Sequence, residues 1–127
     1  GIMSTKTENK WRDSSLRPFL DTLPECAYFI KEAKSVRGLP DLVGVFAGVP
    51  FYLEIKKNKQ ELSCSRTKLQ EYMLSRFENA GAFTSFIYPE NAREVLLALL
   101  ERVFDSTMTS MSFDDYKSIK EVILTSF

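Results

Sequence analysis

Histidine is absent from this 127-residue chain. The usual general base at neutral pH and the commonest transition-metal ligand are therefore missing. Ser-His-Asp and Cys-His catalysis are excluded with them. The two cysteines, Cys26 and Cys64, fit neither a disulfide framework nor a zinc site, and we expect both to be reduced thiols. Any catalysis must therefore depend on carboxylates, lysine and hard metal ions.

The sequence also lacks a long apolar run. No segment approaches the roughly 20 residues that a membrane span requires, and the polar start has no signal-peptide pattern. We expect a soluble, cytoplasmic protein with no membrane partner. Hydrophobic residues make up 44% of the chain, which suits one globular domain with its own core. Gly1 and Ile2 precede Met3 as residues left by an expression tag do, so the domain is expected to begin at Met3.

Net charge is also lacking, since the formal charge at pH 7 is zero. By itself this is unfavourable for nucleic-acid binding, because affinity for phosphate comes largely from Lys and Arg. The average hides an asymmetry: residues 31–76 carry nine basic and five acidic side chains, whereas residues 77–127 carry four and eight. A basic middle region is therefore followed by an acidic tail.

The pattern of apolar residues predicts the order of helices and strands. Residues 7–23 have helical periodicity that Pro18 should bend or divide, and residues 26–30 form a strand. Two runs, 41–47 and 49–57, are expected to pair as an antiparallel hairpin around Gly48. A polar loop (57–65) leads to an amphipathic helix that ends at Gly81, followed by a strand over 82–88 and a helix from 91.

The last segment, residues 105–127, is expected to contain a short helix from Ser112 to Leu124 as an extension of the same domain. The complete order is αβββαβα plus this helix. It predicts an α/β fold with a central mixed four-stranded sheet flanked by helices.

A group of charged residues on the hairpin is the candidate catalytic site. Alternate residues of a strand share a face, so Glu54 and Lys56 should project together. Asp41 begins the neighbouring strand, and pairing around Gly48 can bring it close to Glu54, depending on the register. Two adjacent carboxylates favour a cation, and oxygen ligands suit Mg²⁺. The backbone carbonyl of Ile55 is a further candidate ligand, and Lys56 is expected to position the nucleophile or stabilise charge on a phosphate.

The spacing of these residues resembles a known nuclease pattern. Gly38-Leu39-Pro40-Asp41, then Glu54-Ile55-Lys56, then a helix with Gln70 resemble the PD-(D/E)XK nuclease superfamily, and within it the VRR-NUC branch and related phage-type junction resolvases. The resemblance implies a restriction-endonuclease-like core over residues 3–104. It also implies that Asp41 and Glu54 are metal ligands and that Lys56 is the motif lysine.

Two more site residues follow from the resemblance alone. Members of the superfamily often carry an acidic residue on the first helix, for which Glu8 is the candidate metal ligand. Gln70 matches a glutamine that lies beside the catalytic site. The chain departs from the VRR-NUC pattern at Arg12, where a polar amide is common.

Basic residues flank the candidate site on both sides. They could form an ordinary charged surface, but their place in the sequence favours contacts of some of them with the DNA backbone. The seven candidates are Lys31, Lys34, Arg37, Lys57, Lys59, Arg66 and Lys68.

Together these patterns predict a DNA endonuclease that uses Mg²⁺, with Mn²⁺ able to substitute, and that selects branched or junction DNA by its shape. A homodimer is expected, because cutting two strands of a symmetric junction requires two sites related by a two-fold axis. Two alternatives stay open. One is a sequence-specific restriction or homing endonuclease, and the other is a catalytically silent module that binds nucleic acid.

Overall fold

A four-stranded mixed sheet forms the centre of the computed structural model, which describes residues 9–31, 38–106 and 111–127. The strands are β1 (Cys26–Ile30), β2 (Leu42–Phe46), β3 (Val49–Ile55) and β4 (Phe83–Ile87), in the order β1-β2-β3-β4. The first three are antiparallel neighbours, and β4 runs parallel to β3. The predicted α/β fold with a central mixed sheet is confirmed.

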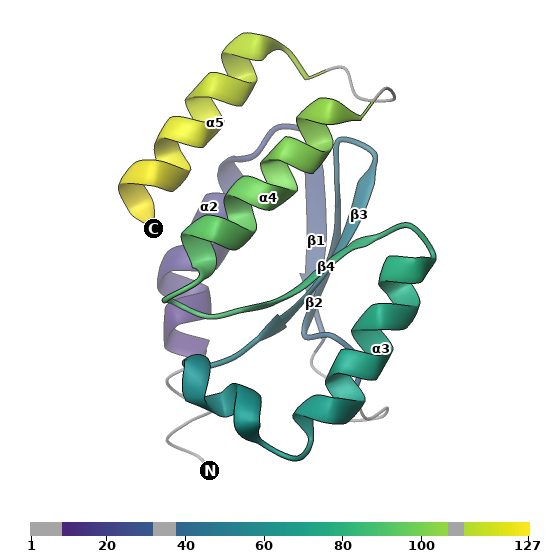
Figure 1. Cartoon of the computed structure of the whole chain (residues 1–127). Helices are drawn as coiled ribbons and strands as arrows, with labels where there is room; N and C mark the ends of the chain where they lie inside the picture. Colours follow the sequence, from purple (N-terminus) through teal and green to yellow (C-terminus); the bar gives the residue numbers. More distant parts are fainter. Residues whose placement is uncertain (1–8, 32–37, 107–110) are drawn as a thin grey trace.

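Helices cover both faces of this sheet (Figure 1). On one face lie α2 (Arg17–Thr22), α4 (Ala92–Asp105) and α5 (Phe113–Ser126), and on the other lies α3 (Thr67–Asn79). The hydrophobic core joins Leu20 of α2, Leu53 of β3 and Leu100 of α4. The side of the sheet that faces α3 carries Tyr52, which stacks on Phe77 of α3, and next to it Glu54, which contacts α3 through Gln70.

The first helix contains Pro18 without being divided by it. Residues 9–22 are helical throughout, but Arg12–Leu16 form the π-helical segment η1, in which the backbone N–H of Arg17 donates to the carbonyl of Arg12. Proline has no N–H to donate and its ring crowds the preceding turn. The wider π-helical turn just before α2 accommodates the proline. The sequence therefore predicted where the helix is perturbed, but not that the perturbation is a π-helical turn.

The hairpin between β2 and β3 has the register that the candidate site requires. Ala47 and Gly48 both have positive φ, 48° and 88°, as a two-residue type I′ turn demands. The paired residues run from Phe46 opposite Val49 to Leu42 opposite Leu53. One further step along this register places Asp41 opposite Glu54.

Two predicted segments are corrected by the structure. The polar loop over residues 57–65 contains a 3₁₀ helix, η2 (Lys59–Ser63), whose start is capped because the Asn58 side chain accepts from the backbone N–H of Glu61. The C-terminal helix begins after Ser112, as predicted, but it is not short. With 14 residues, α5 is as long as α4, and it places Ile119 and Ile123 in the core.

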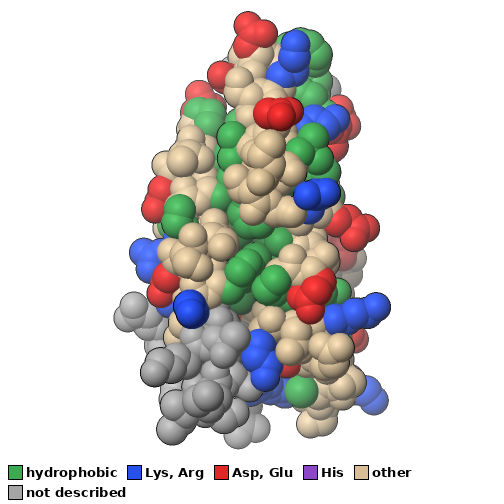
Figure 2. All heavy atoms as spheres, turned by 90° about the vertical axis from the view of Figure 1, so that its left-hand side faces the viewer, with side chains coloured by type: hydrophobic (Ala, Val, Ile, Leu, Met, Phe, Trp, Pro, Cys, Tyr) green, Lys and Arg blue, Asp and Glu red, His purple; other side chains and the backbone are tan. Residues whose placement is uncertain are grey.

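The face that carries α2 and α5 is shown in Figure 2, where hydrophobic side chains run along the middle between charges of both signs. A hydrophobic groove of about 340 Å³ lies here, bordered by Phe19 and Leu23 on one side and Ile119 and Val122 on the other. Within the described ranges, no helix is both long and apolar enough to cross a membrane.

Candidate active site

Asp41 lies one residue before β2, at the end of the sheet where β1, β3 and β4 finish. Its carboxylate oxygen Oδ2 accepts from the backbone N–H of Ile55, at 3.0 Å, and its backbone carbonyl accepts from the N–H of Lys31, at 2.7 Å. These bonds tie Asp41 to both neighbouring strands. The side chain is half-buried and held beside β3.

Glu54 and Lys56 share one side of β3, as the alternation predicted, while Leu53 and Ile55 point into the core. Both charged side chains are buried, with only 4% of Glu54 and 2% of Lys56 exposed. Carboxylates and lysines are almost never buried this deeply unless they are paired. Each must therefore have a partner inside the protein.

Gln70 of α3 is the partner of both. Its Nε2 donates to Glu54 Oε1, at 2.9 Å, and its Oε1 accepts from Lys56 Nζ, at 2.6 Å. An amide side chain can donate to a carboxylate through its nitrogen and accept from a lysine through its oxygen at the same time. Gln70 thus couples the two charged residues of β3 to α3.

One oxygen of this network accepts no hydrogen bond from the residues that the structure describes. Glu54 Oε2 is buried, and no hydrogen-bond donor in the described part of the chain reaches it. The same carboxyl has its pKa raised to about 9, first by burial, next by the charge of Asp41, and then by the hydrogen bond that its protonated form makes with Asp41. Lys56 and Lys31 act in the opposite direction and lower this pKa. The two lysines do not outweigh burial and the Asp41 charge, so Glu54 has too little positive charge around it to stay ionised at neutral pH.

A divalent cation between Asp41 and Glu54 fits this arrangement. It would supply the missing positive charge next to Oε2, and carboxylate oxygens are the ligands that Mg²⁺ prefers. In residues 9–31, 38–106 and 111–127, no group of three His, Cys, Asp or Glu side chains forms a ligand set. The site therefore offers two carboxylates, with the Ile55 carbonyl on the intervening residue of the same strand end. Glu8, predicted as a further ligand, lies outside the described residues.

A cavity of about 440 Å³ opens beside Gln70. Gly38, Arg66 and Leu69 also line it, so the loop before Asp41 and the start of α3 form its walls. Gly38 has a φ of +81°, and a Cβ there would lie 2.9 Å from Leu69 Cγ. Glycine at this position lets the loop approach α3 closely next to the site.

The predicted DNA-binding residues differ in accessibility. Lys59, Arg66 and Lys68 are exposed, and Arg66 lines the cavity. Lys31 and Lys57 are half-buried, and Lys31 Nζ donates to the Leu39 carbonyl, at 3.2 Å. Lys34 and Arg37 lie outside the described residues.

Phe86 is a site neighbour that the sequence did not single out for this position. It lies opposite Glu54 in the parallel pairing of β3 with β4, and Lys56 Nζ lies 5.7 Å from the centre of its ring. The ring forms an apolar wall with a favourable electrostatic contact to the lysine. The β3–β4 register, which no short motif reveals, determines this placement.

No protein family, curated protein or solved structure matches the chain. The resemblance to the PD-(D/E)XK superfamily therefore stays a prediction. The structure brings Asp41, Glu54, Lys56 and Gln70 to one face of the sheet, and their chemistry has to be judged from that geometry.

Proposed function

We propose that this chain is a metal-dependent DNA endonuclease that hydrolyses phosphodiester bonds, with its active site at Asp41, Glu54 and Lys56. The observation that carries the proposal is the buried Glu54 carboxyl group. It lies beside Asp41, no donor of the described residues reaches its Oε2, and Gln70 links its Oε1 to Lys56. Two carboxylates held together in a buried position raise the pKa of one of them, and such shifts concentrate at functional sites.

The roles of the residues follow from their positions. Asp41 and Glu54 would hold Mg²⁺ or Mn²⁺. The bound ion supplies Lewis acidity toward the scissile phosphate and lowers the pKa of coordinated water. Lys56, held by Gln70 beside the carboxylates, orients the attacking water or stabilises the charge that develops on the phosphate. Gln70 positions Lys56 and Glu54 relative to each other.

Exposed basic residues near the cavity support a polyanionic substrate. Arg66 lines the opening, and Lys59 and Lys68 are exposed close to it in sequence. Contacts from such residues to phosphates fix the position of DNA without reading its sequence. We therefore favour selection of branched or junction DNA by shape. A homodimer, which would supply two active sites, belongs to the same proposal.

Incubation with supercoiled plasmid, flap and four-way junction DNA tests this function, with Mg²⁺, Mn²⁺ or EDTA present. We expect cleavage with either metal, none with EDTA, and losses of at least about 100-fold for Asp41→Ala and Lys56→Ala, as for removal of a central catalytic group. Asp105→Asn, an exposed carboxylate at the end of α4, is the matched control and should cleave normally.

The same assay separates the alternatives. Cleavage of plasmid at fixed sequences, with no preference for branched DNA, would identify a sequence-specific endonuclease. DNA binding without cleavage by the wild-type protein under every metal condition would identify a silent binding module. Equal cleavage by wild type and Asp41→Ala would show that Asp41 is not part of the active site.

A further inference from the structure

The α3 side of the sheet is covered over β3 and β4 but open over β1 and β2. α3 packs on β3 and β4, and Figure 1 shows α2, α4 and α5 on the opposite side of the sheet. On β1, Phe29 has 64% of its surface exposed, and on β2, Val45 has 48% exposed, although both side chains are apolar. Contiguous exposed apolar surface often marks the binding site of a ligand or partner.

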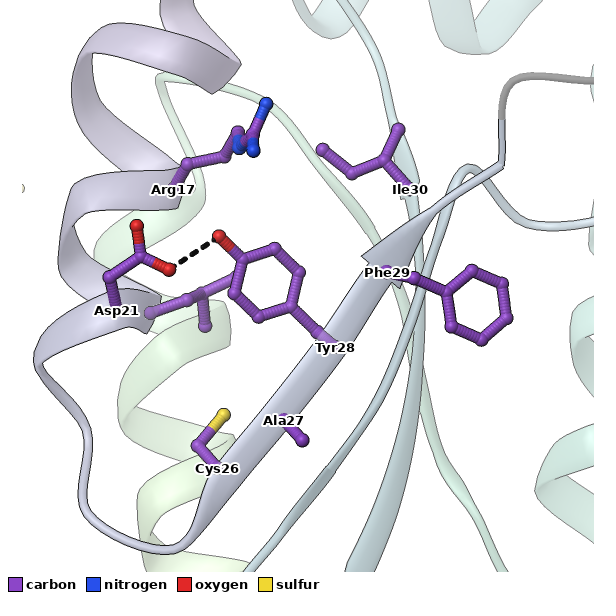
Figure 3. A pocket seen from close by; sticks show the side chains of 8 residues that line it. Arg17, Asp21, Cys26, Ala27, Tyr28, Phe29 and Ile30 are labelled. Carbon is purple, nitrogen blue, oxygen red and sulfur yellow. Dashed lines mark hydrogen bonds between the residues drawn. The ribbon is translucent and has the colours of Figure 1, made fainter.

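Strand alternation determines which residues form this surface. Figure 3 shows Tyr28 extending toward α2, where its hydroxyl donates to Asp21 Oδ1 at 2.7 Å, while Phe29 points to the other side of β1. Phe29 lies opposite Val43 of β2, and Val43 lies opposite Tyr52 of β3. A second row lies next to this one on the same side of the sheet. The open face consists of these two rows: Phe29, Val43 and Tyr52, and then Ala27, Val45 and Pro50.

The open face adjoins the candidate active site directly. The backbone N–H of Lys31 donates to the Asp41 carbonyl, so these two residues continue the β1–β2 pairing one step beyond the strands, and Glu54 lies on the other side of Asp41. Asp41 is therefore two residues along β2 from Val43, or about 7 Å. A DNA strand with a phosphate at Asp41 meets α3 on the β4 side. The uncovered surface of the sheet beside it is the open face.

The flank of α3 that borders the open face is basic. Leu69 lies on this flank, because a Cβ on Gly38, in the loop that precedes β2, would be 2.9 Å from its Cγ. Arg76 follows about two turns later on the same flank and is exposed. The exposed acidic residues of α3, Glu71 and Glu78, lie on the opposite flank. The charge next to the open face therefore favours a polyanion.

We propose that the open face binds an unpaired segment of the DNA substrate, with a base stacked on Phe29 and the backbone beside Arg76. The inference rests on the proposed function, which places the cleaved bond at Asp41. Phe29, Val43 and Val45 have no groups that read base edges, and covering the charged phosphates of a duplex with them would be unfavourable. The faces of unpaired bases, in contrast, stack on aromatic side chains. Phe29 thus selects DNA with a single-stranded segment next to the cleaved bond.

Fluorescence anisotropy with a short labelled oligothymidylate tests this surface, in EDTA so that no cleavage occurs. The comparison probe is an abasic chain of the same length, which has phosphates but no bases. We expect Phe29→Ala to weaken binding of oligothymidylate at least about fivefold and to leave binding of the abasic chain unchanged. Phe29→Trp keeps an aromatic surface and should bind within about twofold of wild type. Phe113→Ala, the matched control, removes a similarly exposed phenylalanine from α5 and should bind normally.

Arg76→Ala tests the backbone contact separately. It should weaken binding of both probes and reduce the slope of log affinity against log salt by about 0.7, the value for one phosphate contact on a single strand. Asp41→Asn should still prefer oligothymidylate over the abasic chain, so loss of nuclease activity and loss of the open face are distinguishable.

Three results would overturn the proposal, with melting temperatures as the check that each variant is folded. The first is equal affinity of the wild-type protein for the two probes. The second is unchanged binding of oligothymidylate by Phe29→Ala. The third is a dimer in sedimentation velocity that Phe29→Ala dissociates, because the open face would then be covered by a second copy of the chain rather than by DNA.

Discussion

Glu54 is the side chain whose surroundings are least suited to its charge. It is almost fully buried, faces Asp41, and has one oxygen without a donor among the described residues. Its pKa is raised from 4.5 in the unfolded chain to about 9 in the folded protein. The metal-free folded state therefore keeps a proton that the unfolded state releases, so stability is full below pH 4.5 and falls as pH rises toward 9.

Glu54→Gln removes this titration while keeping the shape of the side chain. We expect the metal-free variant to be more stable than wild type at pH 8, by on the order of 1–3 kcal/mol, and less sensitive to pH between 4.5 and 9. Thermal or urea denaturation across this pH range in EDTA measures it. If the stabilities of the two proteins changed with pH in parallel, the pKa of Glu54 would not be raised by folding.

Gln70 is tested by a variant that keeps its size but not its hydrogen bonds. Gln70→Leu leaves Lys56 Nζ without its acceptor and Glu54 Oε1 without its donor. Unpaired buried polar groups cost about 1–3 kcal/mol each, so we expect a lower melting temperature. Cleavage should also fall at least about 10-fold, because Lys56 loses its orientation. Glu71→Ala, the exposed next residue on α3, should change neither stability nor cleavage.

At the scale of elements, strands and helix starts were predictable, and local irregularities were not. β1 and β4 were predicted to within a residue or so, because short apolar runs bounded by polar or proline residues are typical of buried strands. The segments η1 and η2 were missed, and α5 continues two residues beyond its predicted end at Leu124. They depend on how Pro18, Asn58 and the core around Ile123 are accommodated, which is a matter of packing rather than of periodicity.

The proximity of Asp41, Glu54 and Lys56 was predictable from the sequence, but their environment was not. Alternation along β3 placed Glu54 and Lys56 on one face, and the hairpin placed Asp41 beside them. Their burial could not be predicted, since it depends on α3 packing over β3 and on Gln70 reaching both side chains. Phe86 enters only through the parallel register of β4.

Gly44 tests the packing of β2 between its neighbours. A Cβ there would lie 2.5 Å from Phe51 Cζ and 2.7 Å from the backbone carbonyl oxygen of Ala27, so Gly44→Ala forces the strands apart. We expect a loss of at least about 2 kcal/mol in unfolding free energy. In Gly81→Ala the added Cβ meets open space, and only the φ of +108° is unfavourable for alanine, which should cost about 1 kcal/mol. Urea titrations of the two variants compare them, and equal losses would contradict the packing described for β2.

For the whole molecule, the arrangement separates two surfaces. The candidate site and Arg66 lie on the α3 side of the sheet, whereas α5 lies on the other. The affinity for DNA at the site should therefore depend only on residues on the α3 side of the sheet. Charged residues of α5 should contribute little to DNA affinity.

Salt dependence of DNA binding measures this division. Arg66→Ala should weaken binding of branched and linear DNA alike, and should reduce the slope of log affinity against log salt by about 1. Lys120→Ala on α5 removes the same charge from the other side and should leave the slope unchanged. Fluorescence anisotropy in Ca²⁺ or EDTA gives the affinities without cleavage. Equal effects of the two variants would mean that DNA does not bind on the α3 side.

Titration of the protein with Mn²⁺, followed by calorimetry and by the paramagnetic signal of the free ion, tests the central claim that Asp41 and Glu54 form a metal site. We expect saturable binding by wild type, release of protons on binding because Glu54 must give up its proton, and loss of binding in Asp41→Asn. Asp105→Asn should bind as wild type does. Equal Mn²⁺ binding by wild type and Asp41→Asn, or none by either, would contradict the account.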